Sequence, residues 1–295
     1  EFRRVLFRSN KGIELDLGFK ILNKTTVGLE VYGNWNNNQN KVLDLAGAAR
    51  VELTNQSITS NAIVGQPLGT LFSSRAERNE NGALVLDANG FPKLAPQQGI
   101  IGNPNPNWRG GFGLKGFFKK LNFNVLFETF QGADFAERSR FVLNSFGTYE
   151  DTGNEVTLTK DLKNSAGKVF PSGTTLRGNI FDFGAGDVLL DENWYTTLGG
   201  GLGGSAINEF SISDGSWTRL REISIGYNLG GDKFKKLTKL SSIDFSISGR
   251  NLMLWTKIKG IDPEVNQSGV DNGFGVEYFT NPSTRSWVFS AKINF

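Results

Sequence analysis

Three groups of residues in this sequence could carry chemistry, and the first is a run of glycines. GGGLGG, at positions 199–204, satisfies the G-x-G-x-x-G spacing of loops that hold dinucleotide phosphates. Such a loop follows a strand and begins a helix, because the helix N-terminus helps to bind the phosphate. No helical pattern follows this run and no βαβ unit surrounds it. The sequence therefore favours a flexible loop, and we expect no cofactor.

The second group contains acidic side chains within one polar stretch. They are Asp182, Asp187, Asp191 and Glu192. Two carboxyl groups on either side of a glycosidic bond could serve a carbohydrate-cleaving enzyme as acid and as base or nucleophile. Such a pair must be held on rigid elements, whereas these residues lie in a predicted loop. We therefore expect no enzyme and no catalytic residues.

The third group offers oxygen ligands for a Ca²⁺ ion. It consists of Asp262, Glu264, Asn266 and Asp271. Carboxylate and amide oxygens suit this cation, but the spacing is not that of an EF-hand loop. An ordinary polar loop explains the same residues, and we expect no metal site.

Composition excludes several further classes of site. Cysteine and histidine are both absent, which rules out disulfides, thiolate chemistry, histidine metal sites and any catalytic triad with histidine. The 32 basic and 29 acidic residues give a net charge of only +3, so no nucleic-acid partner is expected. The residues that could do chemistry are thus few, and the elements that position them become the main question.

The elements are expected to be β-strands. The chain has 37 glycines and 24 phenylalanines, an excess that favours turns and tightly packed strands over helices. No run approaches the roughly 18 apolar residues of a membrane helix, which excludes a helical membrane protein. Strands of an outer-membrane barrel escape such a search, because half of their residues are polar. The predicted fold class is therefore all-β.

The last nine residues show this pattern most clearly. In WVFSAKINF, Trp287, Phe289, Ala291, Ile293 and Phe295 fall on one face of a strand, opposite polar neighbours. An apolar face of this kind fits either the core of a soluble sandwich or the lipid side of a barrel.

The rest of the chain contains six similar stretches, which makes seven predicted strands together with the last nine residues. Long strands are predicted at residues 11–22, 27–35, 108–118, 121–130, 217–229, 242–255 and 287–295. Short turns at Asn23, Lys119 and Asp232, the last with a possible helix at 232–240, alternate with long polar connections at 36–107, 132–216 and 256–283. Shorter strand-like pieces lie at 41–45 and 51–54. Residues 1–9 match neither period and are interpreted as a cloning or assembly scar outside the fold.

The tryptophans favour a membrane over a soluble core. Trp35, Trp108, Trp217, Trp255 and Trp287 each lie at the long-loop end of a strand, with the parity of its apolar face. A bilayer sorts indole rings by height into an interface girdle, whereas core packing has no reason to do so.

Two arginines fit this pattern badly. Arg219 and Arg221 share the parity of Trp217, so either a bulge shifts the register there or these arginines lie near the interface.

Several separated motifs resemble one known family. They are NKGIELDL (residues 10–17), NKVLDL (40–45), VGQPLGTLF (64–72), IGNPNPNWRGGFGLKGFFKKLNFNVLFETFQGADF (101–135), DGSWTRLREISIGYNL (214–229), SGRNLMLWTKIKGIDPEVN (248–266), YFTNPSTRSW (278–287) and the final INF. In this order they closely resemble the C-terminal barrel segment of the SusC/RagA family of TonB-linked outer-membrane proteins. The resemblance covers nearly all of residues 10–295.

The resemblance implies a fold, a location and partners. The whole protein would be a barrel of about 22 strands in the cell outer membrane, closed by an N-terminal plug, and this chain would hold about seven of those strands as an open antiparallel segment. It would import oligosaccharides or peptides, with energy from a TonB complex acting through the missing N-terminal part and with a SusD-like lipoprotein as a lid. Outer-membrane lipid would be a further partner.

Two alternatives from other classes compete with this transporter. One is a soluble or surface-attached β-sandwich that binds glycans, and the other is the carbohydrate-cleaving enzyme considered above. In the transporter, the aromatic residues of the long loops would contact substrate or the lid, or else pack within the loops. They are Trp194, Tyr195, Tyr149 and Phe210. The residues expected to face lipid are Phe245, Ile247, Phe289 and Ile293.

Overall fold

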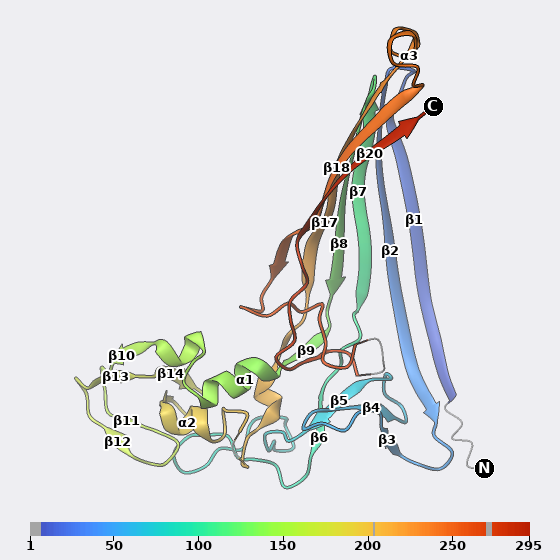
Figure 1. Ribbon diagram of the computed structural model, residues 1–295. Coiled ribbons are helices and arrows are strands. Elements are labelled where there is room, and N and C mark those ends of the chain that lie inside the picture. The colour runs from blue at the N-terminus through green and yellow to red at the C-terminus, as the bar shows by residue number, and fades with distance from the viewer. Residues whose placement is uncertain (1–6, 203, 270–272) are drawn as a thin grey trace.

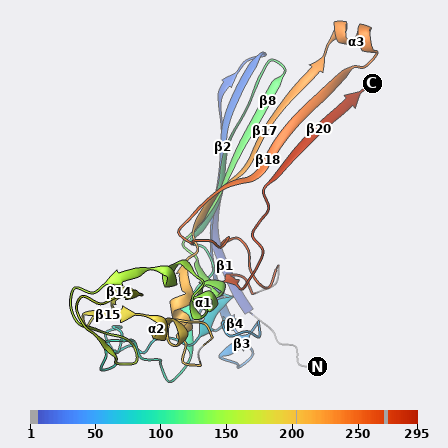
Figure 2. The same cartoon turned by 60° about the vertical axis from the view of Figure 1, so that its left-hand side comes forward.

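A computed structural model describes residues 7–202, 204–269 and 273–295. Its main element is a tall antiparallel sheet of seven strands, with folded loops at one end (Figures 1 and 2). The strands are β1 (Phe7–Asn23), β2 (Val27–Asp44), β7 (Trp108–Phe118), β8 (Leu121–Gln131), β17 (Trp217–Gly230), β18 (Ser242–Thr256) and β20 (Ser286–Asn294). Because each strand alternates apolar with polar residues, each can form one apolar face.

Neighbouring strands of this sheet follow one another along the chain, in the order β1-β2-β7-β8-β17-β18-β20. The short connections lie together at one end, and the one between β17 and β18 contains the helix α3 (Asp232–Thr238). The long connections lie at the other end (Figure 1). The predicted all-β class, the seven strands and the helical turn are confirmed.

Two strand boundaries differ from the sequence prediction. β1 begins at Phe7, and Arg8 and Ser9 pair with Val42 and Lys41, so residues 7–9 belong to the strand and do not lie outside the fold. β2 does not end at Trp35 but runs to Asp44. Asparagine has a low strand propensity, so the sequence of residues 36–40 gives no strand signal, but the equally long β1 supplies the pairing partners. Residues 1–6 lie outside the described residues.

The register divides the sheet into two faces, because directly paired residues of antiparallel strands point to the same side. The face that carries most large apolar residues is called the outer face here. It includes Leu17, Phe19, Val31, Phe112, Phe123, Ile225, Phe245, Ile247, Phe289 and Ile293. The opposite, inner face includes Glu14, Asp16, Glu30, Tyr32, Lys115, Asn122, Asn124, Ser224, Asp244, Ser246 and Ser290.

The sheet is open, as predicted. β1 and β20 are its two edges, and within the described residues each of them pairs with only one strand of this sheet. The figures show a curved wall whose edge strands do not meet (Figures 1 and 2). This curvature suits a segment of a barrel wall.

The long connections fold into small sheets and short helices. The sheets pair β3 (Arg50–Glu52), β4 (Thr59–Ile63), β5 (Thr70–Ser73) and β6 (Gly99–Gly102); β16 (Ile212–Asp214), β9 (Asp134–Glu137) and β19 (Val276–Glu277); β10 (Glu155–Thr157) and β13 (Thr175–Arg177); β11 (Leu162–Lys163) and β12 (Val169–Phe170); and β14 (Asn179–Asp182) and β15 (Asp187–Leu190). The helices are α1 (Arg138–Ser145), α2 (Glu192–Thr196) and two 3₁₀ turns, Glu150–Gly153 and Asn208–Ser211. In the part of the chain that the structure describes, no helix is long and apolar enough to cross a membrane.

Candidate functional site

The outer face of the sheet is apolar and uncovered. Leu17, Phe19 and Phe289 expose 70%, 72% and 75% of their surfaces. A soluble sandwich would bury such side chains under a second sheet, and none of the described residues forms one over this face. A contiguous exposed apolar band of this size indicates a surface that meets lipid or another protein.

Four of the five tryptophans at the long-loop end lie on this outer face. Trp35 and Trp255 share one row of the sheet, which runs through Gly110, Thr129 and Thr218. Trp108 pairs with Gln131 and Trp287 with Gly249, both also on the outer face. The shared face of these four tryptophans follows from the strand pattern.

The expectation that Trp217 shares this face is wrong. The register between β17 and β8 places Arg221 as an extra residue on β17, between Leu220 and Glu222. Such a bulge reverses the facing of the residues on one side of it. Trp217 therefore lies on the inner face, is only 8% exposed and stacks on Phe130 with 5.9 Å between ring centroids. Of the two explanations that the sequence left open for the arginines, the bulge is confirmed.

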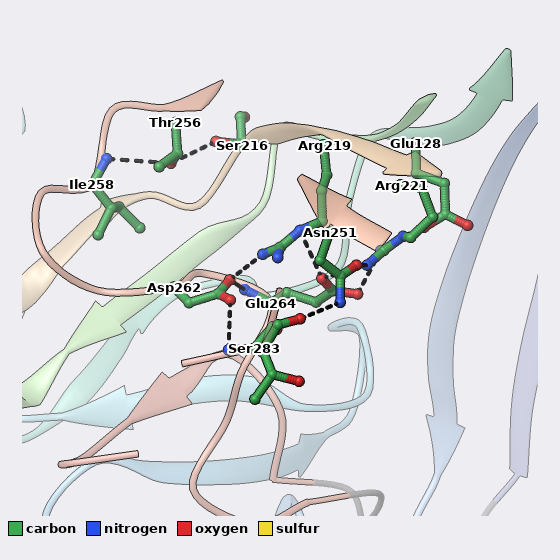
Figure 3. A network of polar contacts seen from close by, with 11 residues as sticks. Glu128, Ser216, Arg219, Arg221, Asn251, Thr256, Ile258, Asp262, Glu264 and Ser283 are labelled. Atoms are coloured by element: carbon green, nitrogen blue, oxygen red, sulfur yellow. Dashed lines mark hydrogen bonds and ion pairs between the residues drawn. The ribbon is translucent and has the colours of Figure 1, made fainter. Parts of the chain in front are cut away.

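Arg219 uses this inner position to bind the loop between β18 and β20. Its Nη2 donates to Oδ1 of Asp262 over 2.6 Å, and both side chains are about 95% buried, with 4% and 5% exposed. Its Nε lies 3.1 Å from Oε2 of Glu264, at an angle that gives an ion pair but no hydrogen bond. Figure 3 shows the guanidinium pointing from the strand toward the loop.

Arg221 makes a second set of bonds beside the first. It binds both carboxylate oxygens of Glu264 at 3.0 and 2.6 Å, which is the bidentate geometry that a guanidinium favours. It also donates to Glu128 on β8 at 2.6 Å and to Asn251 on β18 at 2.9 Å (Figure 3). Both guanidinium groups lie over the ring of Trp217, at 5.8 Å for Arg219 and 5.6 Å for Arg221. The bulge thus presents two arginines that fasten the loop to the inner wall.

Asp262 and Glu264, which were considered as Ca²⁺ ligands, therefore bind the two arginines. Asp262 also accepts the backbone N–H groups of Glu264 and Ser283, at 3.1 and 3.0 Å. Burial alone would raise the pKa of Asp262, but the bonds from Arg219 and Ser283 outweigh it and hold this pKa below its ordinary value. No cluster of three or more acidic residues that could hold a metal occurs among the described residues, and Asp271 lies outside them.

The four acidic residues considered for glycosidase chemistry also serve the local structure. Asp182 accepts the N–H groups of Gly184 and Gly186 within its own turn, and Asp187 pairs with Lys160 at 2.7 Å. Asp191 caps α2 by accepting the N–H of Asn193. Glu192, in the first turn of α2, is exposed. Asp182 and Asp187 are paired in register where β14 and β15 meet, but the carboxylate of each is engaged by the separate contacts given above.

The glycine run at 199–204 packs against the two loop helices. A Cβ on Gly200 would meet the carbonyl oxygen of Tyr195 at 1.7 Å, and one on Gly199 would meet Nε1 of Trp194 at 2.2 Å. These glycines are needed for close approach to α2, and no helix follows them in the described part of the run. The dinucleotide motif is therefore accidental. Gly203 lies outside the described residues.

The aromatic residues of the loops are mostly core residues. Trp194 and Tyr195 are 5% and 8% exposed and form a cluster with Phe91, Val188 and Leu190. Phe210 packs against the same cluster, with its ring centroid 5.7 Å from that of Trp194. Of the two roles that the sequence left open for Trp194 and Tyr195, their burial supports packing within the loops, because long loops can bury their own apolar side chains. Tyr149 is half-buried and donates to the carbonyl oxygen of Lys259.

Two buried glutamates escaped the sequence analysis. Glu137 and Glu277 are 3% and 2% exposed and are paired in register where β9 and β19 run parallel. Glu277 accepts the hydroxyl of Ser139 at 2.6 Å, and Glu137 pairs with Arg140 at 3.2 Å. The bond between Ser139 and Glu277 fastens the part of the β18–β20 loop that contains β19. Strands this short leave no periodic signal by which the pair could be found.

Comparisons with known proteins agree with this geometry. TonB-dependent receptor P3 of Formosa agariphila is 25% identical over 215 residues, which cover 71% of this chain and 18% of that receptor. TonB-dependent receptor P26 of the same organism is 25% identical over 318 residues, which cover 93% of this chain and 28% of the receptor. No protein-family model matches the chain.

Solved structures of the RagAB transporter have a similar fold. The structure of the RagAB peptide transporter has a TM-score of 0.62 at 18% identity, over 98% of this chain and 29% of that chain. The RagAB peptide importer in the "open-open" state has a TM-score of 0.64 at 17% identity, over 99% and 29%. The resemblance to SusC/RagA-type TonB-dependent receptors is confirmed.

This chain spans less than a third of the length of these related proteins. Its open seven-stranded sheet corresponds to part of a receptor barrel wall. Arg219 and Arg221, with their partners Asp262, Glu264, Glu128 and Asn251, form an arginine network (Figure 3). This network lies on the inner side of the wall, near the end where the long loops meet it.

Proposed function

We propose that this chain is part of the barrel of a TonB-dependent transporter in the cell outer membrane. The observation that carries the proposal is the division of one continuous wall into an exposed apolar outer face and a polar inner face. A membrane barrel needs this division, because its outside meets lipid and its inside lines a polar lumen. Trp35, Trp108, Trp255 and Trp287 would form part of an aromatic girdle at the lipid interface.

The proposed substrates are peptides or oligosaccharides, and the proposed partners are a SusD-like lipoprotein and a TonB complex. The related proteins support this kind of function, since two are TonB-dependent receptors and the RagAB structures are of a peptide transporter. TonB would act through a plug that belongs to the part of the protein outside this chain, with residues 10–295 as the C-terminal barrel part and no chemistry of their own.

Uptake by the whole protein tests this function. Cells without the gene should fail to take up a labelled peptide or oligosaccharide mixture, and the full-length gene should restore uptake only when TonB is present. A SusD-like lipoprotein should copurify with the full-length protein. Uptake that does not depend on TonB would contradict the proposal.

The position of the loops gives an independent test. An epitope inserted at Gly173, where the backbone turns with a φ of 83° and no atom would meet an added Cβ within 4 Å, should be detected on intact cells. The same epitope at Lys120, in the opposite turns, should be detected only after the outer membrane is opened. The reverse result would contradict the proposed orientation, in which the long loops face the cell exterior.

A further inference from the structure

The turns at the short-connection end of the sheet form one continuous surface. The N–H of Lys119 donates to Thr26, the N–H of Asn228 donates to Lys120, and the N–H of Ser241 donates to Asn294, each at 2.7 to 2.9 Å. Nζ of Lys120 also donates to the carbonyl oxygen of Gly230. The turns between the strands and the end of β20 are therefore fixed side by side, with α3 beside them (Figures 1 and 2).

This surface is strongly basic. Within residues 228–241 there is one acidic residue, Asp232, and there are four lysines. The lysines of this segment and of the neighbouring hairpin are all exposed, and they are Lys119, Lys120, Lys233, Lys235, Lys236 and Lys239. The loop at the opposite end, residues 132–216, carries twelve acidic and six basic residues. The two ends of the wall therefore differ in charge, although the whole chain is nearly balanced.

An exposed apolar side chain lies among these lysines. Leu237 of α3 is 86% exposed, so no part of the described chain covers it. The outer face ends next to this surface with Phe118, Leu229 and Ile293, which are 55%, 38% and 50% exposed. An apolar residue among lysines beside a lipid-facing band is the arrangement of an element that lies at a membrane interface.

We infer that this basic turn surface binds the headgroups of anionic phospholipids in the membrane leaflet that it meets. The inference rests on the proposed membrane location of the outer face. Clustered lysines attract anionic headgroups, while Leu237 can enter the acyl boundary. In a membrane, the negative charges nearest to the basic turn surface are the phosphate groups of the lipid headgroups. Charge and position therefore both favour lipid as the ligand of this surface.

The experiment uses the full-length protein in nanodiscs that contain equal amounts of phosphatidylglycerol and phosphatidylethanolamine. Lipids retained after gentle release are counted by native mass spectrometry. The wild-type protein should retain the anionic lipid in at least about threefold excess, and added salt should lower this excess. The variant K233Q/K235Q/K236Q should retain both lipids about equally. The matched control K93Q/K163Q/K168Q, which removes three exposed lysines at the loop end, should behave as the wild type.

The outcomes separate this inference from the proposed function. A protein that inserts into the nanodisc but retains the two lipids equally, or whose preference survives in K233Q/K235Q/K236Q, overturns the inference alone. Failure of the wild-type protein to insert would instead contradict the membrane location. Crosslinking of Lys235 to an acidic periplasmic protein, without any lipid preference, would assign the surface to a protein partner and overturn the lipid inference.

Discussion

Arg219 on β17 and Asp262 in the β18–β20 loop form a buried ion pair, with 2.6 Å between Nη2 and Oδ1. The pair joins a residue of the inner wall to a loop that Arg221 also binds, through Glu264. It exists because the bulge at Arg221 turns Arg219 inward. One extra residue in a strand therefore decides how a loop is held.

Loss of Arg219 should release this loop. Arg219→Met keeps the aliphatic stem but leaves the carboxylate of Asp262 buried without its main partner, which should cost about 3 to 5 kcal/mol. The cost is measured as the shift in urea unfolding of the full-length protein in micelles, together with protease cleavage within residues 257–283. Lys257→Met is the matched control, because the pair of Lys257 with Asp214 is exposed and should contribute little to stability. Equal effects of the two changes would contradict a special role for the buried pair.

The contribution of Asp262 to the stability of the folded protein should decrease as the pH falls. Its pKa is lower in the folded protein than the ordinary value of 3.8, so its stabilising effect is complete above that value and is lost as pH falls through the folded pKa. The difference in unfolding midpoint between wild type and Asp262→Asn should be largest near pH 6 and shrink below pH 3.8. A difference that stays constant down to pH 2 would show that the ionised carboxylate is not what matters.

Trp194 should stabilise the folded loop at residues 132–216 and should not contact substrate directly. Trp194→Ala removes a ring that is 5% exposed and packed against Phe91, which should cost about 3 to 5 kcal/mol. Faster protease cleavage of the loop at 132–216, with the barrel intact, is the expected readout. Phe146→Ala provides the control, since Phe146 is 65% exposed. If both variants resist protease equally and only uptake changes, Trp194 contacts substrate after all.

The open edges of the sheet predict how this chain behaves alone. β1 and β20 each leave one row of backbone donors and acceptors unpaired, and such edges recruit other chains. Residues 7–295 expressed by themselves should aggregate and give no heat-modifiable band on a semi-native gel. A compact heat-modifiable species that conducts ions in a bilayer would mean that these strands close a small pore.

The sequence predicted the wall of this structure better than its loops. The period of two in Trp287–Phe295 and in the other long strands reflects a face that must be apolar, and such a pattern is readable without coordinates. Residues 36–40 are polar on both faces, so their place in β2 depends on pairing with β1, which propensity does not report.

The contacts of Arg219 and Arg221 likewise could not be predicted from the sequence pattern. Arg219 and Arg221 conflicted with the pattern of β17, and Asp262 and Glu264 were interpreted as residues of an ordinary polar loop. The arginines bind these acidic residues, but the two members of each pair are 43 residues apart in the sequence. Only the strand register and the fold of the loop show that they meet. The burial of Trp194 is likewise a tertiary property, since a tryptophan in a polar stretch has the same sequence signal whether it is covered or exposed.

In the proposed barrel, the outer face of the sheet meets lipid while the inner face meets water. The chain contains no cysteine, so single cysteines can be introduced for spin labels at Phe245, Ile247 and Phe289 on the outer face and at Ser246, Ser248 and Ser290 on the inner face. In outer-membrane vesicles with the full-length protein, the outer labels should be relaxed mainly by oxygen and the inner labels mainly by a water-soluble nickel complex. Relaxation that does not alternate between neighbouring positions, or nickel access at Phe289 equal to that at Ser290, would contradict the account.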